Sequence, residues 1–160
     1  MTMITSTIAG KELFWFNNTL VTINVSSDDG EDGICVVEHR LPHGDSPPLH
    51  VHRNEDEVFH ILAGRLCFQI NGHERVIGAG ETVIAPKGLS HTFRVESPEG
   101  AHMLTITHGS DFETMLRQAS RPAERPALPP LAEPTPEMIE ALTGLCAENG
   151  IDIVGPPLKG

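Results

Sequence analysis

The chain has no tyrosine and only one tryptophan among its 160 residues. The absence of tyrosine excludes a tyrosyl acid or radical from any mechanism. Basic residues are also scarce, with 11 Lys and Arg against 22 Asp and Glu, which gives a formal net charge of −11. Because phosphates are bound through a basic footprint, this balance disfavours nucleic acid and, equally, an anionic membrane surface as partners.

Long hydrophobic runs and paired cysteines are missing as well. No apolar stretch approaches the ~18 residues that span a bilayer, and none resembles a cleavable signal peptide. The three cysteines, Cys35, Cys67 and Cys146, are widely separated and form no CxxC pair. We therefore expect buried, reduced thiols in a cytoplasmic protein. At 160 residues, the chain has the length of one domain with one core.

The sequence does contain a series of short apolar runs separated by turn residues. In residues 20–25 the side chains alternate in the period-2 pattern of a half-buried strand. Asn71 and Gly72 predict a tight hairpin turn, because both residues tolerate positive φ. Turn signals spaced about 8–12 residues apart predict an all-β sandwich or barrel. The expected strands are residues 13–16, 20–25, 34–41, 58–62, 66–70, 75–77, 82–85, 91–95 and 103–107.

From Ser110 onward the pattern changes from strands to helices. Ser110 and Glu113 have the spacing of a capping box, in which the serine caps the helix and the glutamate reaches back. Residues 121–136 hold six prolines, which predicts an extended strap along the barrel or a neighbouring subunit. Thr135 followed by Pro136 predicts the start of a second helix.

That second helix has one apolar face, which we expect to pack on the barrel or on a second subunit. Its members are Met138, Ile139, Leu142, Leu145 and Cys146. The chain therefore divides into a barrel, residues 1–109, and a C-terminal segment, residues 110–160, which holds the two helices and the Pro-rich strap.

Metal-ligand chemistry is concentrated between Gly44 and Gly64. In an extended strand His50 and His52 point to the same side, about 7 Å apart at the backbone, and so can converge on one ion. Glu57 begins the next apolar run and can return its carboxylate to the same point. His91 is a fourth candidate ligand. Three imidazoles and a carboxylate suit one divalent transition metal ion: iron, manganese, nickel, cobalt or zinc.

Two blocks of sequence resemble the cupin motifs. The block from Gly44 to Gly64 has the pattern Gly, five residues, His-x-His, four residues, Glu, six residues, Gly at every defining position. The block from Gly80 resembles the second motif through His91, but Val95 stands where that motif has Asn. The resemblance implies an all-β cupin double-stranded β-helix, a jelly-roll barrel, followed here by C-terminal helices and a Pro-rich strap. It also implies that the metal ligands are His50, His52, Glu57 and His91.

The C-terminal part of the sequence resembles one subgroup of the cupins in particular. A barrel, a short helix, a Pro-rich strap, an amphipathic helix and an Ile-x-Ile-x-Gly-Pro-Pro end at residues 151–157 are similar to the single-domain bacterial quercetinase-like cupins. That similarity implies a mononuclear-metal dioxygenase, forming a homodimer, that acts on a small aromatic or enol substrate with dioxygen. Glu57 is the candidate base for a substrate hydroxyl, since burial raises a carboxyl pKa while a bound cation lowers it.

Alternate residues of a strand point to opposite faces of the sheet, so the parity of a residue relative to a candidate ligand indicates whether its side chain can face the pocket. Phe59 and Phe93 share parity with Glu57 and His91, so they are candidates for the walls of a substrate pocket, with core packing as the alternative. His60 has the opposite parity and should face away from the metal. The remaining histidines have no ligand spacing and are expected at the surface: His39, His43, His73, His102 and His108.

Two other functions stay open. The first is a non-oxidative isomerase or lyase, in which the metal polarises a carbonyl. An additional base within the pocket, or an arginine that binds a carboxylate, would favour it; Arg94 is the nearest arginine, but its parity points it outward. The second is a non-catalytic protein that binds a small molecule and needs no open coordination position.

Overall fold

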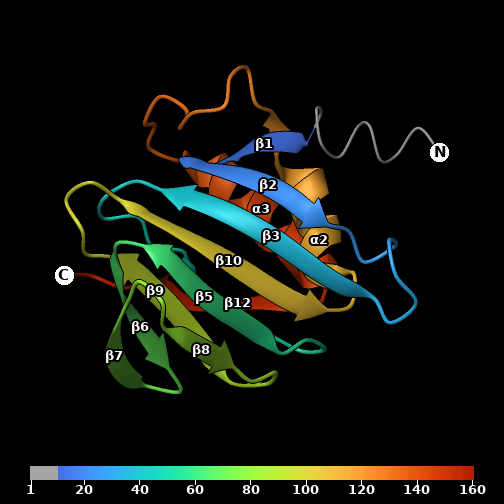
Figure 1. Cartoon of the computed structure of the whole chain (residues 1–160), viewed down its shortest axis with the longest axis horizontal. Helices are drawn as coiled ribbons and strands as arrows, with labels where there is room; N and C mark the ends of the chain where they lie inside the picture. Colours follow the sequence, from blue (N-terminus) through green and yellow to red (C-terminus); the bar gives the residue numbers. More distant parts are fainter. Residues whose placement is uncertain (1–10) are drawn as a thin grey trace.

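The computed structural model describes residues 11–160, which form two antiparallel β-sheets with two helices behind the larger one (Figure 1). The first ten residues, which the sequence assigns to the barrel, lie outside the described part. The larger sheet has the strand order β11 (Arg121–Pro122), β1 (Glu12–Phe16), β2 (Thr19–Val25), β3 (Ile34–Leu41), β10 (Ala101–His108), β5 (Glu57–Ala63) and β8 (Thr82–Ala85). The smaller sheet has the order β12 (Ile151–Pro157), β4 (Pro48–His52), β9 (Ser90–Val95), β6 (Arg65–Ile70) and β7 (His73–Gly78). The predicted all-β architecture is confirmed.

The core occupies the space between the two sheets and continues beneath the helices. One cluster joins Phe59 and Ile61 of β5 to Phe68 of β6. A second cluster joins inward residues of β2 and β3 to helix α2 (Asp111–Ala119), through side chains that include Phe112 and Leu116. The three cysteines are free and buried, as expected.

The hairpin turns follow the predicted chemistry. Asn71 and Gly72 both have positive φ, 51° and 81°, in the tight turn between β6 and β7. Asn17, with φ of 53°, makes the corresponding turn between β1 and β2. Asparagine and glycine tolerate this region of backbone space better than other residues. These turns set the register that sends alternate side chains toward the core.

The Pro-rich strap lies against the β1–β2 hairpin. The Trp15 indole donates a hydrogen bond to the Ala127 carbonyl at 2.7 Å. The Asn18 side chain accepts from the Ala132 amide at 3.0 Å and donates to the Ala132 carbonyl at 3.1 Å. Arg125 adds a cation–π contact on the Trp15 ring. The strap is therefore fixed at two points of the hairpin.

Helix α2 does not begin with the predicted capping box. The Ser110 side chain makes no capping hydrogen bond. Glu113 instead accepts from the backbone and hydroxyl of Ser27, each at 2.8 Å, and from the Ser26 hydroxyl. The Glu55 carboxylate caps α2 from a distant loop, so the capping-box prediction is wrong.

Helix α3 (Pro136–Glu148) begins as predicted, because the Thr135 hydroxyl accepts from the Met138 amide at 3.2 Å. Its predicted apolar face contacts the core through Leu142 and Cys146, and packing on a second subunit stays a prediction. Only Cys146 is buried, while Met138 and Ile139 each remain 52% exposed. Neither α2 nor α3 in the described chain is long and apolar enough to cross a membrane.

The C-terminal tail forms a strand whose pairing was not predicted. In β12, Ile151 pairs with His52 and Ile153 pairs with His50 of β4. The residues that carried the resemblance in the tail therefore support the strand that bears two of the candidate ligands.

Candidate metal centre

Three strands bring the four candidate ligands together. His50 and His52 come from β4, His91 pairs directly with His50 from β9, and Glu57 opens β5 in the other sheet. One potential ligand atom from each side chain lies within 4.8 Å of the others. The cluster thus spans the gap between the two sheets, at one end of the core.

The geometry of the cluster centres on one carboxylate oxygen. Glu57 Oε2 lies 2.9 Å from His52 Nε2 and 2.9 Å from His91 Nε2. The His50 and His91 rings are 4.3 Å apart, centroid to centroid. His50 Nδ1 lies 2.7 Å from the Pro48 carbonyl oxygen. A proton on Nδ1 is donated to that carbonyl, which leaves Nε2 of His50 free as a ligand atom.

Burial and the contacts among the clustered side chains shift the pKa values of His50, His52 and Glu57. Burial, reinforced by the neighbouring His91 and His52, lowers the pKa of His50 to about 3. Burial also acts to lower the pKa of His52, but the Glu57 carboxylate outweighs it and raises that pKa. For Glu57 burial acts upward, yet His52 and His91 hold its pKa well below the usual range. The pKa of Glu57 is therefore lowered overall, although burial alone would raise it.

The donor set fits a divalent transition metal ion. His52, Glu57 and His91 are 2%, 3% and 1% exposed, so their polar atoms have little access to water. Nδ1 of His52 has no hydrogen-bond partner among the described residues, and Nε2 lies 2.9 Å from Glu57 Oε2 without forming an aligned hydrogen bond. Buried polar atoms without partners are costly, and a cation held by Nε2 of each imidazole and the carboxylate would satisfy the cluster. Nitrogen and oxygen donors of this kind suit the metals named above.

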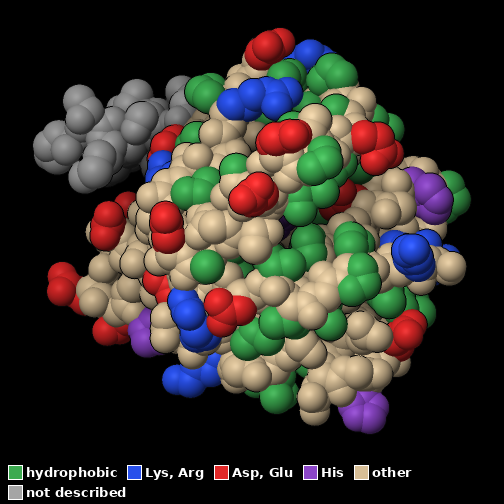
Figure 2. Space-filling model, turned by 180° about the vertical axis from the view of Figure 1, so that it is seen from behind, with side chains coloured by type: hydrophobic (Ala, Val, Ile, Leu, Met, Phe, Trp, Pro, Cys, Tyr) green, Lys and Arg blue, Asp and Glu red, His purple; other side chains and the backbone are tan. Residues whose placement is uncertain are grey.

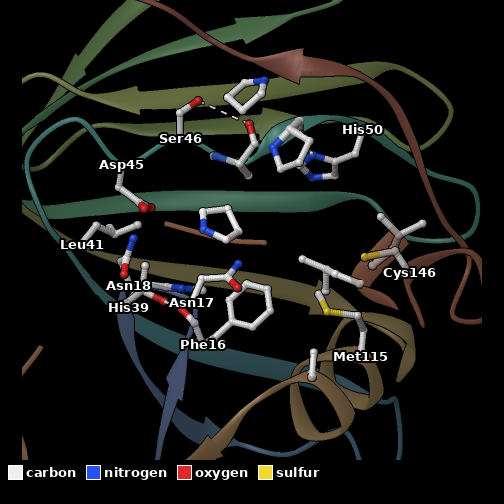
Figure 3. Close-up of a pocket in the computed structure, with 18 of the residues that line it drawn as sticks. Phe16, Asn17, Asn18, His39, Leu41, Asp45, Ser46, His50, Met115 and Cys146 are labelled. Atoms are coloured by element: carbon white, nitrogen blue, oxygen red, sulfur yellow. Dashed lines mark hydrogen bonds between the residues drawn. The ribbon is translucent and has the colours of Figure 1, made fainter. Parts of the chain in front are cut away.

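A pocket of about 620 Å³ adjoins the cluster, and His50, His52 and Glu57 reach its wall. Phe59 and Phe93 also line it, as the sequence suggested, although each is packed in the core as well. Figure 3 shows His50, Met115 and Cys146 on one side of this pocket and Asp45, Asn18 and His39 on the other. Seen from behind, the molecule shows apolar side chains around a central hollow (Figure 2).

The outer part of the pocket is built by the C-terminal segment. Pro130, Ala132 and Pro134 of the strap line it, together with Met138 and Ile139 of α3. The apolar face of α3 therefore serves as a pocket wall, which explains why these two side chains remain half exposed.

Two polar residues of the pocket were missed or misplaced by the sequence analysis. His39, expected at the surface, is buried and lines the pocket. Its parity with Cys35 and Val37, both buried in β3, was the available signal. Asp45 also lines the pocket, and burial raises its pKa to about 6. It lies in a loop, where no periodicity indicates the direction of a side chain.

The other histidines lie outside the cluster. His60 faces away from it, as predicted, with Nδ1 2.8 Å from the Thr82 hydroxyl. His102 pairs with Glu38 at 2.6 Å. His43, His73 and His108 are exposed. Arg94 pairs with Glu96 and does not line the pocket.

Residues 37–107 match the family model of the cupin domain. Over 121 residues the chain is 23% identical to Quercetin 2,3-dioxygenase of Bacillus subtilis, covering 76% of this chain and 36% of that protein. It is 40% identical over 53 residues to the oxalate-binding protein of Thermotoga maritima, covering 33% of this chain and 44% of that protein. The chain thus spans less than half the length of these relatives.

Solved structures agree with the domain match. An RmlC-like cupin from Shewanella frigidimarina superimposes with a TM-score of 0.54 at 16% identity, covering 62% of this chain and 85% of that one. Together with the two antiparallel sheets, this similarity establishes the cupin fold.

Proposed function

We propose that this chain, whose residues 37–107 match the cupin domain, binds one divalent transition metal ion and acts as a dioxygenase of quercetinase type. The proposed ligands are His50, His52, Glu57 and His91, and the proposed substrates are a small aromatic or enol molecule and dioxygen. The observation that carries the proposal is the buried cluster of three histidines and one glutamate on the wall of a largely apolar pocket. The similarity to Quercetin 2,3-dioxygenase supports it.

The pocket has properties that suit such a substrate. Its volume of about 620 Å³ lies within the usual range of small-molecule sites, about 300–1,000 Å³. Phe59 and Phe93 present aromatic rings next to the cluster, with Met103 beside them in the same wall. These side chains can hold a planar ring by offset or edge contacts and exclude water from the reacting oxygen.

The bound ion would supply a Lewis acid that stabilises an anionic substrate oxygen and supports reaction with dioxygen. Glu57 is placed to accept the proton that such a hydroxyl releases. Its Oε2 contacts both His52 and His91, whereas Oε1 makes no hydrogen bond to the described residues. Oε1 is therefore the proposed acceptor. If the Glu57→Gln variant kept both full metal content and full activity, this role of Glu57 would be disproved.

Oxygen uptake tests the proposal directly. Protein reconstituted separately with Fe(II), Mn(II), Co(II) and Ni(II) is given quercetin, and oxygen consumption is compared with flavonol loss. We expect the two to agree for at least one metal and to vanish in His50→Ala. The matched control is His60→Ala, which removes an imidazole outside the cluster. No uptake with any fully loaded metal would reject the flavonol assignment.

A non-oxidative isomerase or lyase is the second candidate, and one observation favours it. His39 and Asp45 both line the pocket, so it contains additional groups capable of proton transfer. Metal-loaded protein kept under nitrogen in deuterated water would then exchange the α-proton of a keto acid or keto sugar, which NMR detects. Exchange without oxygen uptake would favour this candidate, whereas oxygen uptake without exchange would favour the dioxygenase.

A further inference from the structure

His39 Nε2 and Thr105 Oγ1 are buried polar atoms on the pocket wall without a hydrogen-bond partner among residues 11–160, a property that Ser120 Oγ and the ring nitrogens of His52 share. His39 is 7% exposed and Thr105 is 1% exposed. Neither belongs to the candidate metal centre. A buried donor or acceptor without a partner carries a desolvation cost, so two in one pocket wall need an explanation.

The strand register places these two residues on the same face of the larger sheet. Met103 of β10 pairs with His39 of β3, and Thr105 lies two positions further along the same strand. His39 and Thr105 are therefore diagonal neighbours, with side chains about 7–8 Å apart or less. One ligand oxygen lying between them can bond to both side chains.

The same register connects this pair to the metal centre. Thr105 pairs with Phe59 of β5, and the next inward pair is Thr107 with Glu57. Glu57, Thr105 and His39 thus follow a diagonal line across β5, β10 and β3. The Phe112 ring closes one side, since its centroid is 6.1 Å from that of His39 and 6.0 Å from that of His52.

We propose that His39 and Thr105 form a hydrogen-bonding subsite that holds a second oxygen of the substrate, while the first oxygen lies at the metal centre. The substrate class is then an apolar, planar molecule with two neighbouring oxygen functions. This inference rests on the proposed function, because it assigns the first oxygen to the metal centre.

The chemistry of the subsite favours a neutral oxygen. Burial lowers the pKa of His39 to about 4, so the imidazole is neutral near pH 7 and offers one donor and one acceptor. The Thr105 hydroxyl also donates and accepts. A hydroxyl or carbonyl oxygen can be satisfied by this pair, whereas a carboxylate would find no positive charge there.

Two probes with the same ring system test the subsite: 2-naphthol, with one hydroxyl, and 2,3-dihydroxynaphthalene, with two. Binding to Zn(II)-loaded protein is measured by calorimetry under nitrogen, so that no turnover is needed, and metal content is determined for every sample. We expect the wild-type protein to bind the diol more tightly. Thr105→Val and His39→Leu should each reduce this preference about 3- to 10-fold, the effect of one hydrogen bond.

Thr107→Val is the matched control. Thr107 lies on the same face of β10 and is 3% exposed, but it does not line the pocket. The Thr107→Val variant should leave the preference for the diol over 2-naphthol unchanged. Thr105→Val should also keep the wild-type stability toward urea, because the hydroxyl loses no bond to the described residues. A purely structural role would instead lower stability.

The possible failures are distinguishable. A preference that persists in both subsite variants means that both oxygens bind the ion, and it overturns the subsite alone. An equal loss in Thr107→Val, or a wild-type protein that does not prefer the diol, overturns it too. A wild-type protein that binds neither probe rejects the aromatic substrate class of the proposed function, and the subsite with it.

Discussion

Glu55 and Phe112 are joined across 57 positions of sequence, where Glu55 Oε1 accepts a hydrogen bond from the Phe112 amide at 3.0 Å. Glu55 Oε2 accepts a longer bond, 3.3 Å, from the Asp111 amide. A carboxylate at a helix N-terminus satisfies free amides and complements the helix dipole. The loop between His52 and Glu57 thereby fixes α2, whose Phe112 ring lies next to His39 and His52.

Replacing this carboxylate should destabilise the protein. Glu55→Ala is expected to lower the free energy of unfolding by about 1–2 kcal/mol, the usual cost of losing an N-terminal cap. Ser110→Ala should change it by less than about 0.5 kcal/mol, because Ser110 makes no capping bond. Urea unfolding of both variants provides the measurement. If Ser110→Ala lowered the free energy of unfolding more than Glu55→Ala does, the capping box predicted from the sequence would be supported after all.

The strands and the shared face of His50 and His52 were predictable because their signals are local, whereas Glu57 and His91, which lie on other strands, were joined to them by the resemblance to the cupin motifs. Period-2 alternation and the His-x-His spacing determine which side chains share a face, whatever the rest of the chain does. The α2 cap was not predictable, since Glu55 competes for the helix amides from 57 positions away. The pairing of β12 with β4 is likewise a contact between distant segments. His39 is a different case, because a local signal for it was present. It alternates in step with the buried Cys35 and Val37 of β3, yet it was expected at the surface because it has no ligand spacing.

Metal binding should stabilise the chain through the four clustered side chains. At a free metal concentration 100 times the dissociation constant, the gain in unfolding free energy is about 2.7 kcal/mol. We expect this gain in the wild-type protein and in His60→Ala, and its loss in His50→Ala. Thermal unfolding with and without Zn(II) measures it. An equal gain in His50→Ala would remove His50 from the ligand set.

The ion pair of His52 with Glu57 should make the metal-free protein less stable as pH rises above about 7. In that range His50 and His39, whose pKa values burial lowers to about 3 and about 4, are already neutral and no longer contribute to the pH dependence. Glu57 raises the pKa of His52 above 6.5, so in the metal-free protein their ion pair stabilises the fold fully below pH 6.5. This contribution is lost as pH rises through the raised pKa. Protons compete with the metal for His52, so the metal-induced gain should grow over the same rise. Unfolding curves between pH 7 and 8.5, with and without Zn(II), test both trends.

Asp45 should destabilise the folded chain at neutral and alkaline pH. Burial raises its pKa from 3.8 to about 6, so the cost of the ionised form is absent below pH 3.8 and complete above pH 6. Asp45→Asn is expected to add of order 2 kcal/mol to the unfolding free energy at pH 8 and almost nothing at pH 3.5. Asp28→Asn, in an exposed turn, is the control and should have little effect. A gain of the same size at both pH values would contradict the burial argument.

The strap should loosen when its contact with Asn18 is removed. Asn18→Ala deletes both hydrogen bonds to Ala132, each worth about 0.5–1.5 kcal/mol, whereas Asn18→Asp retains the acceptor for the Ala132 amide. Hydrogen exchange of residues 123–134 should therefore accelerate most in Asn18→Ala and less in Asn18→Asp. Metal affinity should stay at the wild-type value, because the strap contributes no ligand. Unchanged exchange in both variants would show that Trp15 and the prolines hold the strap alone.

Val95 stands where the second cupin motif has asparagine, and packing explains why the change is tolerated. Its side chain is fully buried in the apolar core, opposite Leu66 of β6. Its backbone still holds the loop before β4, since Val95 O accepts from the Gly44 amide and Val95 N donates to the Asp45 carbonyl, both at 3.0 Å.

Restoring asparagine should therefore destabilise this chain. Val95→Asn buries an amide among apolar side chains, and we expect a loss of about 2–4 kcal/mol in unfolding free energy. Val95→Thr keeps the branched shape and adds only a hydroxyl, so it should lose about 1–2 kcal/mol. Metal content should remain full in both, because none of the four clustered residues changes. A neutral Val95→Asn would mean that the amide finds a partner, and a crystal structure of that variant would identify it.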